Sequence, residues 1–445
     1  MTEKSGMTNF PDKSSGKKII MFFPKVPYPL REHGISVRYY PILEHLSETH
    51  TLDLVIFRPK PDKKEAYEAL RKYCRNVSYL QNPRYLKHGM VSKLTTYCKY
   101  AAPWYPPLSL ASHGCSDMPR IIAEQSGRDR YDVLLWVGSA FLPHLQSAMP
   151  LKNVGRVIVD FIDSPSLVRK RWKNDASRFD SIERYELWKT IRWEGEVIRR
   201  MDETIYISDV DSRMVPDAFT PGKHRHVIPN GVDFRSYTKE RVEGIASPSI
   251  GFLGHMGYAP NIEAAGWLFR EVFLPLKERV PGLSLVLIGR DPDEPILKLR
   301  EYPGVTVTGT VENIWPYVNS VDLFMFPLWT GAGLKNKILE SMYARRPVIT
   351  TPIGNEGINA VSGKDILVRH DSAGFREEAL RLLNSPEDRR SMGDHARDFV
   401  RNGFSWPPIL KAYEEIVTGD ASPGRPSNRI HPAKQEGTAP RKSFS

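Results

Sequence analysis

Short apolar runs alternate with amphipathic segments along most of the chain. Residues 18–23, 131–137 and 323–326 are apolar at nearly every position, which is typical of strands buried on both faces of a parallel sheet. The segments between such runs are amphipathic and predict helices. This alternation predicts an α/β fold in which helices cover doubly wound, Rossmann-like sheets. Further strands are predicted at residues 52–57, 77–80, 156–161, 203–208, 249–253, 283–289, 305–309, 347–351 and 365–368.

Length and charge narrow the class of protein. At 445 residues the chain is longer than single hydrophobic cores usually grow, so two domains are expected. The formal net charge is +11, and the two ends, residues 1–18 and 419–445, contribute +2 and +3 of it. The +6 left for the body suits a phosphate-bearing ligand or an anionic membrane surface at least as well as nucleic acid. No nucleic-acid-binding motif is present, so no nucleic-acid partner is predicted.

Cysteine content and hydropathy predict the location. The three cysteines lack metal-ligand spacing and indicate a reducing compartment. No apolar run is long enough to span a bilayer, and residues 1–17 lack the apolar core of a signal peptide. These features predict a cytoplasmic protein, with contact to the inner face of the plasma membrane as an added option.

A glycine loop between a predicted strand and a predicted helix is the strongest candidate site. Gly331 and Gly333 follow the strand, where a backbone with little side chain can approach a ligand closely. Ligands of open α/β sheets bind at this carboxyl end of the strands, and free N–H groups at a helix start suit phosphate. Lys335 and Lys337 can neutralise a diphosphate, and Glu340 can accept bonds from paired ribose hydroxyls.

These residues resemble a known family. GAGLKNKILESM, followed by RRPVITTPIGNEGI, is similar to the donor-site signature of glycosyltransferase family 4 (the group 1 glycosyltransferases), in particular its exopolysaccharide sugar-transferase branch. The resemblance runs from about residue 18 to 417 and is strong over residues 250–358. It implies the GT-B fold, with two Rossmann-like domains facing each other across a cleft. It also implies transfer of a sugar from a nucleotide-sugar donor with retention of anomeric configuration.

The resemblance further implies a division of the chain. The N-terminal domain would hold the acceptor and the C-terminal domain the donor, and a last helix would cross back onto the N-terminal domain. In chain order the expected parts are a disordered leader (1–17), the N-terminal domain (18–234), a linker (235–248), the C-terminal domain (249–404), the crossing helix (405–418) and a disordered tail (419–445).

Site roles follow from the same resemblance, residue by residue. Glu340 would bind the ribose hydroxyls, and Lys337 with Lys335 would stabilise negative charge on the departing diphosphate. Other donor contacts are expected from the glycine loop, from a segment near the nucleobase and from the loop after the first strand of each domain. The donor-binding residues predicted in this way are Gly331, Gly333, Asn336, Glu312, Asn313, Ile314, Gly254 and Gly34, the last being equally well explained as a plain turn glycine.

Two positions depart from the family pattern. Ala332 stands where many members have the first Glu of a Glu pair whose second member is Glu340, and residues 254–258 lack the usual base. Lys335 and Lys337 could replace that base. A non-catalytic subunit that binds a nucleotide or a partner protein fits these departures, and a nucleotide-sugar epimerase is a further alternative on the same fold. Retention of Glu340 and Lys337 favours catalysis.

The implied reaction needs a nucleotide sugar, a UDP- or GDP-sugar, and a hydroxyl acceptor that is a glycan or a lipid-linked molecule. The product would serve cell-surface polysaccharide or glycoconjugate biosynthesis. The donor is a substrate, so no cofactor is expected. Asp209-Val210-Asp211 and Asp291-Pro292-Asp293 resemble metal-binding pairs, but such pairs are frequent by chance and helix caps explain them, so no metal is predicted.

Three other segments have a functional and a plainer interpretation. Residues 169–200, rich in Arg and Trp, predict one long helix, and their alternating Glu residues favour a solvated surface over nucleic-acid binding. Asp160 and Asp163 could line the interdomain cleft, but a cap of the next helix by Asp163 or Ser164 is favoured. Aromatic residues within 97–107 could seat a lipid-linked acceptor, and packing of a loop is favoured.

Overall fold

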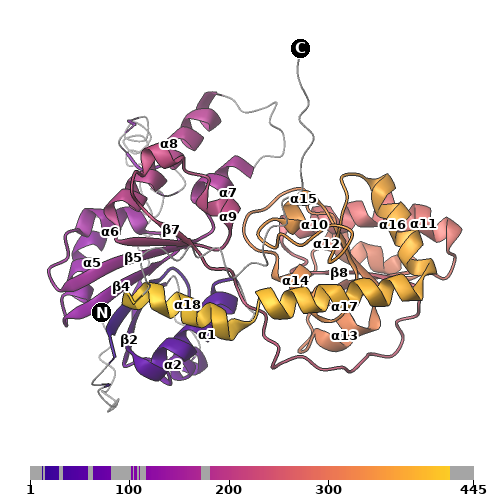
Figure 1. Cartoon of the computed structure of the whole chain (residues 1–445), viewed down its shortest axis with the longest axis horizontal. Helices are drawn as coiled ribbons and strands as arrows, with labels where there is room; N and C mark the ends of the chain where they lie inside the picture. Colours follow the sequence, from indigo (N-terminus) through magenta and orange to yellow (C-terminus); the bar gives the residue numbers. More distant parts are fainter. Residues whose placement is uncertain are drawn as a thin grey trace.

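The computed structural model has two halves, each built around one parallel sheet (Figure 1). The first sheet has seven strands in the order β3-β2-β1-β4-β5-β6-β7, and the second has six in the order β10-β9-β8-β11-β12-β13. Both orders are those of doubly wound sheets, whose ligands lie at the carboxyl ends of the strands. The structure describes residues 13, 16–29, 34–58, 64–81, 102–103, 105–107, 110, 117–171 and 181–420.

The N-terminal half contains the first sheet and the helices around it. Its strands are β1 (Lys18–Phe23), β2 (Thr51–Arg58), β3 (Asn76–Gln81), β4 (Tyr131–Val137), β5 (Val154–Ile162), β6 (Glu203–Tyr206) and β7 (Arg225–Val227). Its helices are α1 (Gly34–Thr49), α2 (Lys64–Arg71), α5 (Met118–Ser126), α6 (Leu142–Ala148), α7 (Pro165–Arg171), α8 (Ser181–Arg200), α9 (Asp209–Ser212) and the 3₁₀ turn η3 (Asp217–Phe219).

The C-terminal half contains the second sheet. Its strands are β8 (Ser249–Leu253), β9 (Ser284–Ile288), β10 (Val305–Val307), β11 (Leu323–Phe326), β12 (Val348–Thr350) and β13 (Leu367–Val368). Its helices are α10 (Ala259–Trp267), the π segment η4 (Leu268–Phe273), α11 (Leu274–Arg279), α12 (Glu294–Lys298), the 3₁₀ turn η5 (Leu299–Glu301), α13 (Trp315–Ser320), α14 (Asn336–Tyr343), α15 (Pro352–Asn355), α16 (Ser372–Asn384) and α17 (Pro386–Gly403). The last helix, α18 (Trp406–Thr418), follows α17.

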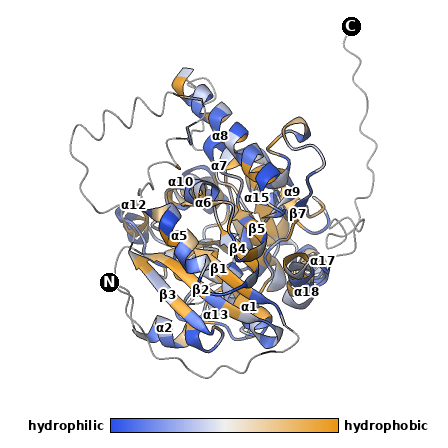
Figure 2. Cartoon of the chain, turned by 90° about the vertical axis from the view of Figure 1, so that its left-hand side faces the viewer, coloured by the Kyte–Doolittle hydropathy of each residue, from blue (hydrophilic) through white to orange (hydrophobic). Residues whose placement is uncertain are grey.

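Apolar side chains pack on both faces of the first sheet, so its strands are hydrophobic ribbons between helices with polar outer faces (Figure 2). One face is covered by α1 together with α18, which runs out of the C-terminal half and lies along the N-terminal half (Figure 1). Ile409, Tyr413 and Val417 of α18 are fully buried there. The last helix therefore ties the two halves together through the N-terminal core.

A buried polar network secures this crossing. Arg38 of α1 donates from Nε and Nη2 to Asp160 Oδ2 at 3.0 and 2.9 Å, and both side chains are fully buried. Nη1 of Arg38 donates to the carbonyl of Ile228 at 2.9 Å and to Asn230 Oδ1 at 3.0 Å. The Tyr413 hydroxyl of α18 completes the set by donating to Asp160 Oδ2 at 3.1 Å. Asp160 is thus a structural residue of the N-terminal half and does not line the cleft.

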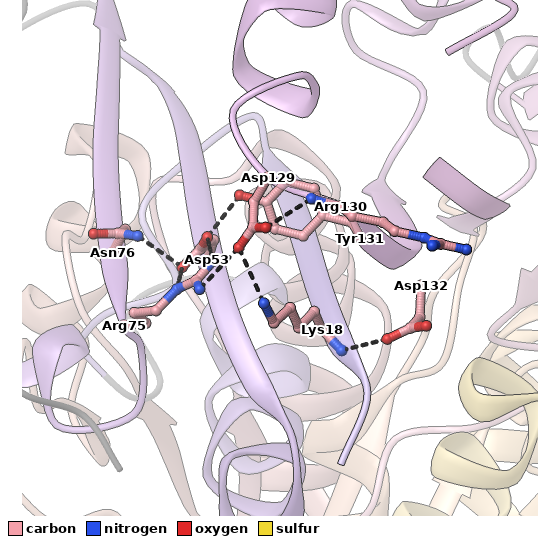
Figure 3. A network of polar contacts seen from close by, with 8 residues as sticks. All are labelled: Lys18, Asp53, Arg75, Asn76, Asp129, Arg130, Tyr131 and Asp132. Carbon is pink, nitrogen blue, oxygen red and sulfur yellow. Dashed lines mark hydrogen bonds and ion pairs between the residues drawn. The ribbon is translucent and has the colours of Figure 1, made fainter. Parts of the chain in front are cut away.

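A second network joins the amino-terminal edge of the same sheet (Figure 3). Asp53 of β2 accepts bonds from Arg75 (2.5 Å to Nη2), from Asn76 (3.1 Å) and from the Tyr131 hydroxyl (2.6 Å). Nη1 of Arg75 also pairs with Asp129 at 3.0 Å. Because these residues lie in or beside β2, β3 and β4, the network fixes the strand starts far from the carboxyl edge where ligands bind.

Most predicted elements are present, and β1, β4, β8 and β11 have the predicted bounds. The single long helix predicted over residues 169–200 is wrong, because α7 and α8 are separate helices that pack against each other. Glu194 shows why this surface is not uniformly solvated. Its buried carboxylate accepts bonds from the Ser164 hydroxyl at 3.0 Å and from the Ser166 N–H at 3.1 Å, at the start of α7.

Two local features complete the C-terminal half. Ser385 caps α17 by accepting a bond from the Asp388 N–H, so α16 and α17 are separate helices. Residues 352–355 form the short helix α15. The aromatic segment at 97–107 and the two chain ends lie largely outside the described residues, so those interpretations stay predictions.

Candidate active site

The glycine loop connects β11 to α14 at the carboxyl edge of the second sheet. Gly331 has φ 108° and Gly333 has φ 73°, backbone conformations that a residue with a Cβ rarely adopts. The two glycines let the chain turn sharply out of the strand and enter α14 at Asn336. This local geometry is what the glycine pattern predicts.

A cavity of about 300 Å³ lies beside this loop, between it and the loop that follows β8. Five of the predicted residues line it, namely Gly254, Gly331, Lys335, Asn336 and Lys337. Its other walls come from His255, Tyr258, Pro260, Asn261, Leu328, Thr330, Ala332 and Leu334. The two loops that the sequence singled out in the C-terminal half thus enclose one site, which we name the loop cavity.

Lys337 lies in the first turn of α14 at the wall of the loop cavity. Its Nζ donates to Asn261 Oδ1 at 2.6 Å and lies over the rings of Phe252 and Phe326, at 4.8 and 5.5 Å from their centroids. Loss of water, with repulsion from Lys335 as the smaller cause, lowers the pKa of Lys337 to about 7. An anion in the cavity would favour the charged ammonium and reverse this shift.

Lys335 holds the glycine loop together. Its Nζ donates to the carbonyl oxygens of Ala332 at 3.2 Å and Gly333 at 2.5 Å. Ala332, at the position of the missing family Glu, therefore binds the lysine through its carbonyl oxygen and also lines the cavity. Burial lowers the pKa of Lys335, and the charge of Asp163 opposes that effect.

Asp163, which follows β5, approaches the glycine loop from the N-terminal half. A Cβ built on Gly333 would lie 2.2 Å from Asp163 Oδ1, so the close approach of the two halves requires glycine at this position. Burial raises the pKa of Asp163 to about 7, and the charge of Asp211 adds to the rise, while Lys335 and Arg38 oppose it. The favoured interpretation, a cap of the next helix by Asp163 or Ser164, is confirmed for Ser164, which accepts a bond from the Leu167 N–H at 3.2 Å at the start of α7, but it misses the placement of Asp163 in the cleft.

Further contacts cross the cleft around the same loop. Arg171, at the end of α7, donates from Nη1 to the carbonyl of Gly331 at 3.0 Å and pairs through Nη2 with Glu356 at 2.5 Å. Asn230 Nδ2 donates to Asn336 Oδ1 at 3.4 Å. Sequence reasoning missed Arg171, because it stands in a run of basic residues that carries no positional signal.

The two Asp-x-Asp pairs have structural partners. Asp211 accepts bonds from the Ser208 hydroxyl at 2.5 Å and from the Ser164 N–H at 2.8 Å, and Ser208 caps α9. Asp293 caps α12 by accepting a bond from the Glu294 N–H at 2.9 Å. Across the described ranges, no group of three or more His, Cys, Asp and Glu side chains could hold a metal ion. Metal independence of the chemistry stays a prediction.

The remaining predicted residues lie outside the lining of the loop cavity. Glu340 is half-buried on α14, one turn after Asn336. Asn313 accepts a bond from the Trp315 N–H at 3.0 Å at the start of α13, next to Glu312 and Ile314. Gly333 lies against Asp163, and Gly34 is the exposed first residue of α1. Their roles toward a donor stay predictions.

Comparison with known proteins identifies this arrangement. Residues 247–385 match the family model described as Glycosyl transferases group 1, and these residues contain the whole loop cavity. A protein of Klebsiella pneumoniae described as an uncharacterized 44.6 kDa protein in the cps region is 20% identical over 413 residues, covering 89% of this chain and 98% of that protein.

Solved structures resemble the whole chain. Sucrose-phosphate synthase from Thermosynechococcus elongatus has a TM-score of 0.63 at 13% identity, covering 90% of this chain and 98% of that one. Anabaena Alr3699/HepE, solved in complex with UDP-glucose, has a TM-score of 0.60 at 13% identity, covering 90% of this chain and 100% of that one. Likeness at this identity shows the fold, and the predicted GT-B architecture is confirmed. This chain is therefore a two-domain GT-B protein whose residues 247–385 match the family model of the group 1 glycosyltransferases.

Proposed function

We propose that this glycosyltransferase moves a sugar, with retention of anomeric configuration and without a metal ion, from a nucleotide sugar to a hydroxyl acceptor. The observation that carries the proposal is Lys337 in the loop cavity. It is a lysine with a pKa of about 7, placed where the start of α14 and the glycine loop meet. The negative charge of an arriving diphosphate would favour the protonated form of this amine, and the resulting cation would then bind the diphosphate.

In the proposed reaction the diphosphate of the donor lies in the loop cavity against Lys337, and Asn261 holds that ammonium in place. Lys335 keeps the glycine loop in its turn by binding two of its carbonyl oxygens. Lys337 stabilises the charge that grows on the departing diphosphate, and a leaving phosphate oxygen takes the proton of the acceptor hydroxyl. The half-buried Glu340 binds the ribose hydroxyls one helical turn away.

Asp163 is the residue of the N-terminal half that we propose to face the reacting sugar. It lies against the glycine loop across the cleft, and the loop cavity opens next to that loop. A carboxyl group there can accept a hydrogen bond from a sugar hydroxyl. Arg171 helps to hold the two halves in this arrangement, because it contacts both Gly331 and Glu356 on the opposite half.

The donor class and the pathway belong to the same proposal. Anabaena Alr3699/HepE is solved with UDP and with UDP-glucose, so a UDP-sugar is our first candidate and a GDP-sugar the second. The Klebsiella relative is described as part of a cps region, which supports a role in surface polysaccharide synthesis with a glycan or lipid-linked acceptor. No helix in the described ranges has the length and hydropathy to cross a membrane. We propose action in the cytoplasm, at the inner face of the plasma membrane.

Calorimetry with a panel of UDP-, GDP-, ADP- and dTDP-sugars tests the donor site. At pH 8 the Lys337 amine is largely neutral, because its pKa is about 7, and a bound diphosphate would recharge it. Binding should therefore take up a proton, seen as a heat that depends on the ionisation enthalpy of the buffer. Lys337→Met should abolish that uptake and weaken binding roughly 100-fold, the scale of a lost charge-assisted contact.

Lys277 provides a matched control. It also lies over a phenylalanine ring, 5.3 Å from the centroid of Phe273, but on α11 outside the loop cavity. Lys277→Met should leave donor affinity and proton uptake unchanged. Absence of binding by every nucleotide sugar, from a protein that unfolds cooperatively, would overturn the proposal in favour of a non-catalytic subunit. Retention is checked by proton NMR of the anomeric centre in the first product formed.

A further inference from the structure

A second cavity, of about 260 Å³, lies in the C-terminal half at the opposite end of α14 from the loop cavity. Helix α14 has eight residues and so spans about 12 Å, which separates the two sites along its axis. Five cationic side chains line this second cavity, and no carboxylate of the described residues is among its lining. We name it the basic pocket and define it by Lys239, Arg241, Arg345, Arg346 and Arg397, together with Tyr237.

The cations of the basic pocket come from three segments that are distant in sequence. Lys239 and Arg241 belong to the connector after the N-terminal half, Arg345 and Arg346 follow α14, and Arg397 is on α17. Cations after a helix are favourable near its carboxyl end, which explains the pair after α14. The end of α14 does not explain why the cations of the linker and of α17 lie beside this pair.

Backbone and aromatic contacts hold three of the arginines of the pocket. Arg346 donates from Nη1 to the carbonyl of Val321 at 3.1 Å, and Arg241 donates from Nε to the carbonyl of Asn319 at 2.9 Å. The guanidinium of Arg397 lies over the rings of Tyr237 and Tyr343, at 5.1 and 4.6 Å. These contacts position the side chains without cancelling their charge.

Charge in the pocket is only partly compensated. Arg345 pairs with Asp394 at 3.2 Å, and this pair is exposed on both sides. Burial and the repulsion from Arg241 lower the pKa of Arg346, with Asp322 opposing the shift. Like charges gathered in this way destabilise one another, and a bound anion would relieve the repulsion.

We propose that the basic pocket binds a phosphate group. Arginine presents planar donors that match phosphate oxygens in pairs, and several guanidiniums converge on one open cavity. A multiply charged anion fits the excess of five lining cations over the two nearby carboxylates, Asp394 and Asp322. The group could belong to a free phosphorylated compound or to a phospholipid headgroup, since the exposed Lys239, Arg241 and Arg345 lie at the protein surface. The site is independent of the donor site proposed above.

Inorganic pyrophosphate is the probe, and isothermal calorimetry of the full chain is the measurement. The double variant Lys239→Gln/Arg345→Gln removes two exposed charges and should fold normally. It should lose one binding component, with affinity falling at least about tenfold. Lys337→Met should retain that component and lose the one that belongs to the loop cavity, so failure of either site is recognised separately. Arg128→Gln/Arg130→Gln, two exposed arginines of the N-terminal half, is the charge-matched control and should change nothing.

Vesicles distinguish the two sources of phosphate. Sedimentation with phosphatidylglycerol vesicles, lost in the Lys239→Gln/Arg345→Gln variant and competed by pyrophosphate, would assign the pocket to a lipid headgroup. Pyrophosphate binding without sedimentation would assign it to a free phosphate compound. Pyrophosphate binding that is unchanged by the Lys239→Gln/Arg345→Gln variant would overturn the proposal.

Discussion

Asp160 lies in β5 and Asp163 directly follows this strand, three residues later, yet the two side chains have opposite environments. Asp160 is fully buried and accepts bonds from Arg38 and Tyr413 within the N-terminal half. Asp163 faces the other half of the molecule, beside the glycine loop and Lys335, and its pKa is raised to about 7. One carboxylate is stabilised by the fold, and the other is held in a position where its charge is costly.

The difference separates a structural region from a functional one. Buried ion pairs with satisfied hydrogen bonds hold parts of a fold together, whereas groups with strongly perturbed pKa values cluster where chemistry takes place. The same contrast holds for cations. Arg38 is paired with a carboxylate in the core, whereas Nζ of Lys337 contacts an amide oxygen and aromatic rings. Three changes test the contrast, in order of their expected effect on stability.

Arg38→Met should have the largest effect on the free energy of unfolding. It leaves Asp160 buried without its cation, a loss of about 3–5 kcal/mol. Urea unfolding followed by circular dichroism measures it. The double variant Arg38→Met/Asp160→Leu should recover part of the loss, because no uncompensated charge then remains. Equal destabilisation of the single and double variants would mean that packing, and not charge, is the main contribution of this pair.

Asp53→Asn should have an intermediate effect, at the amino edge of the first sheet. Asp53 is 4% exposed and accepts bonds from Arg75, Asn76 and Tyr131. An amide in its place would turn an NH₂ group, itself a donor, toward some of these donors. We expect a loss of about 1–3 kcal/mol by urea unfolding. The exposed Asp132, which accepts one bond from the Lys18 N–H, is the matched control, and Asp132→Asn should cost less than about 1 kcal/mol. A similar loss in both variants would contradict a special role for the Asp53 network.

The sequence alone was sufficient to predict the glycine loop, because its determinants are local. Adjacent residues specify each part of it, namely an apolar strand, Gly331 and Gly333 with positive φ, and a following amphipathic helix. The loop cavity could be predicted for a related reason. Carboxyl ends of parallel strands share one edge of a sheet, so the loops after β8 and β11 had to meet.

The roles of Asp160 and Asp163 could not be separated in this way. The pairing of β5 with β6 shifts register between Asp160 and Ile162, and Ile162 has φ 65°, so the chain turns at a place that no sequence pattern marks. Asp160 then meets Arg38 from a helix that is 122 positions away, and Asp163 meets a loop of the other domain. Such long-range contacts depend on how domains pack, and periodicity carries no information about that.

Asp163→Asn should have the smallest effect of the three changes on the free energy of unfolding at low pH. It should instead change how that free energy depends on pH. The folded-state pKa of about 7 lies above the ordinary value of 3.8, so the native state binds the proton more tightly than the unfolded chain. Unfolding free energy should therefore fall as the pH rises from about 4 to 7, and the amide variant, which cannot ionise, should show a flatter profile. Asp211, Lys335, Arg38 and Asp160 also act on this group, so the profile is compared with that of Asp132→Asn under the same buffers. A profile unchanged by Asp163→Asn would place the charge of Asp163 in ordinary solvent, and the distinction between its site and that of Asp160 would no longer hold.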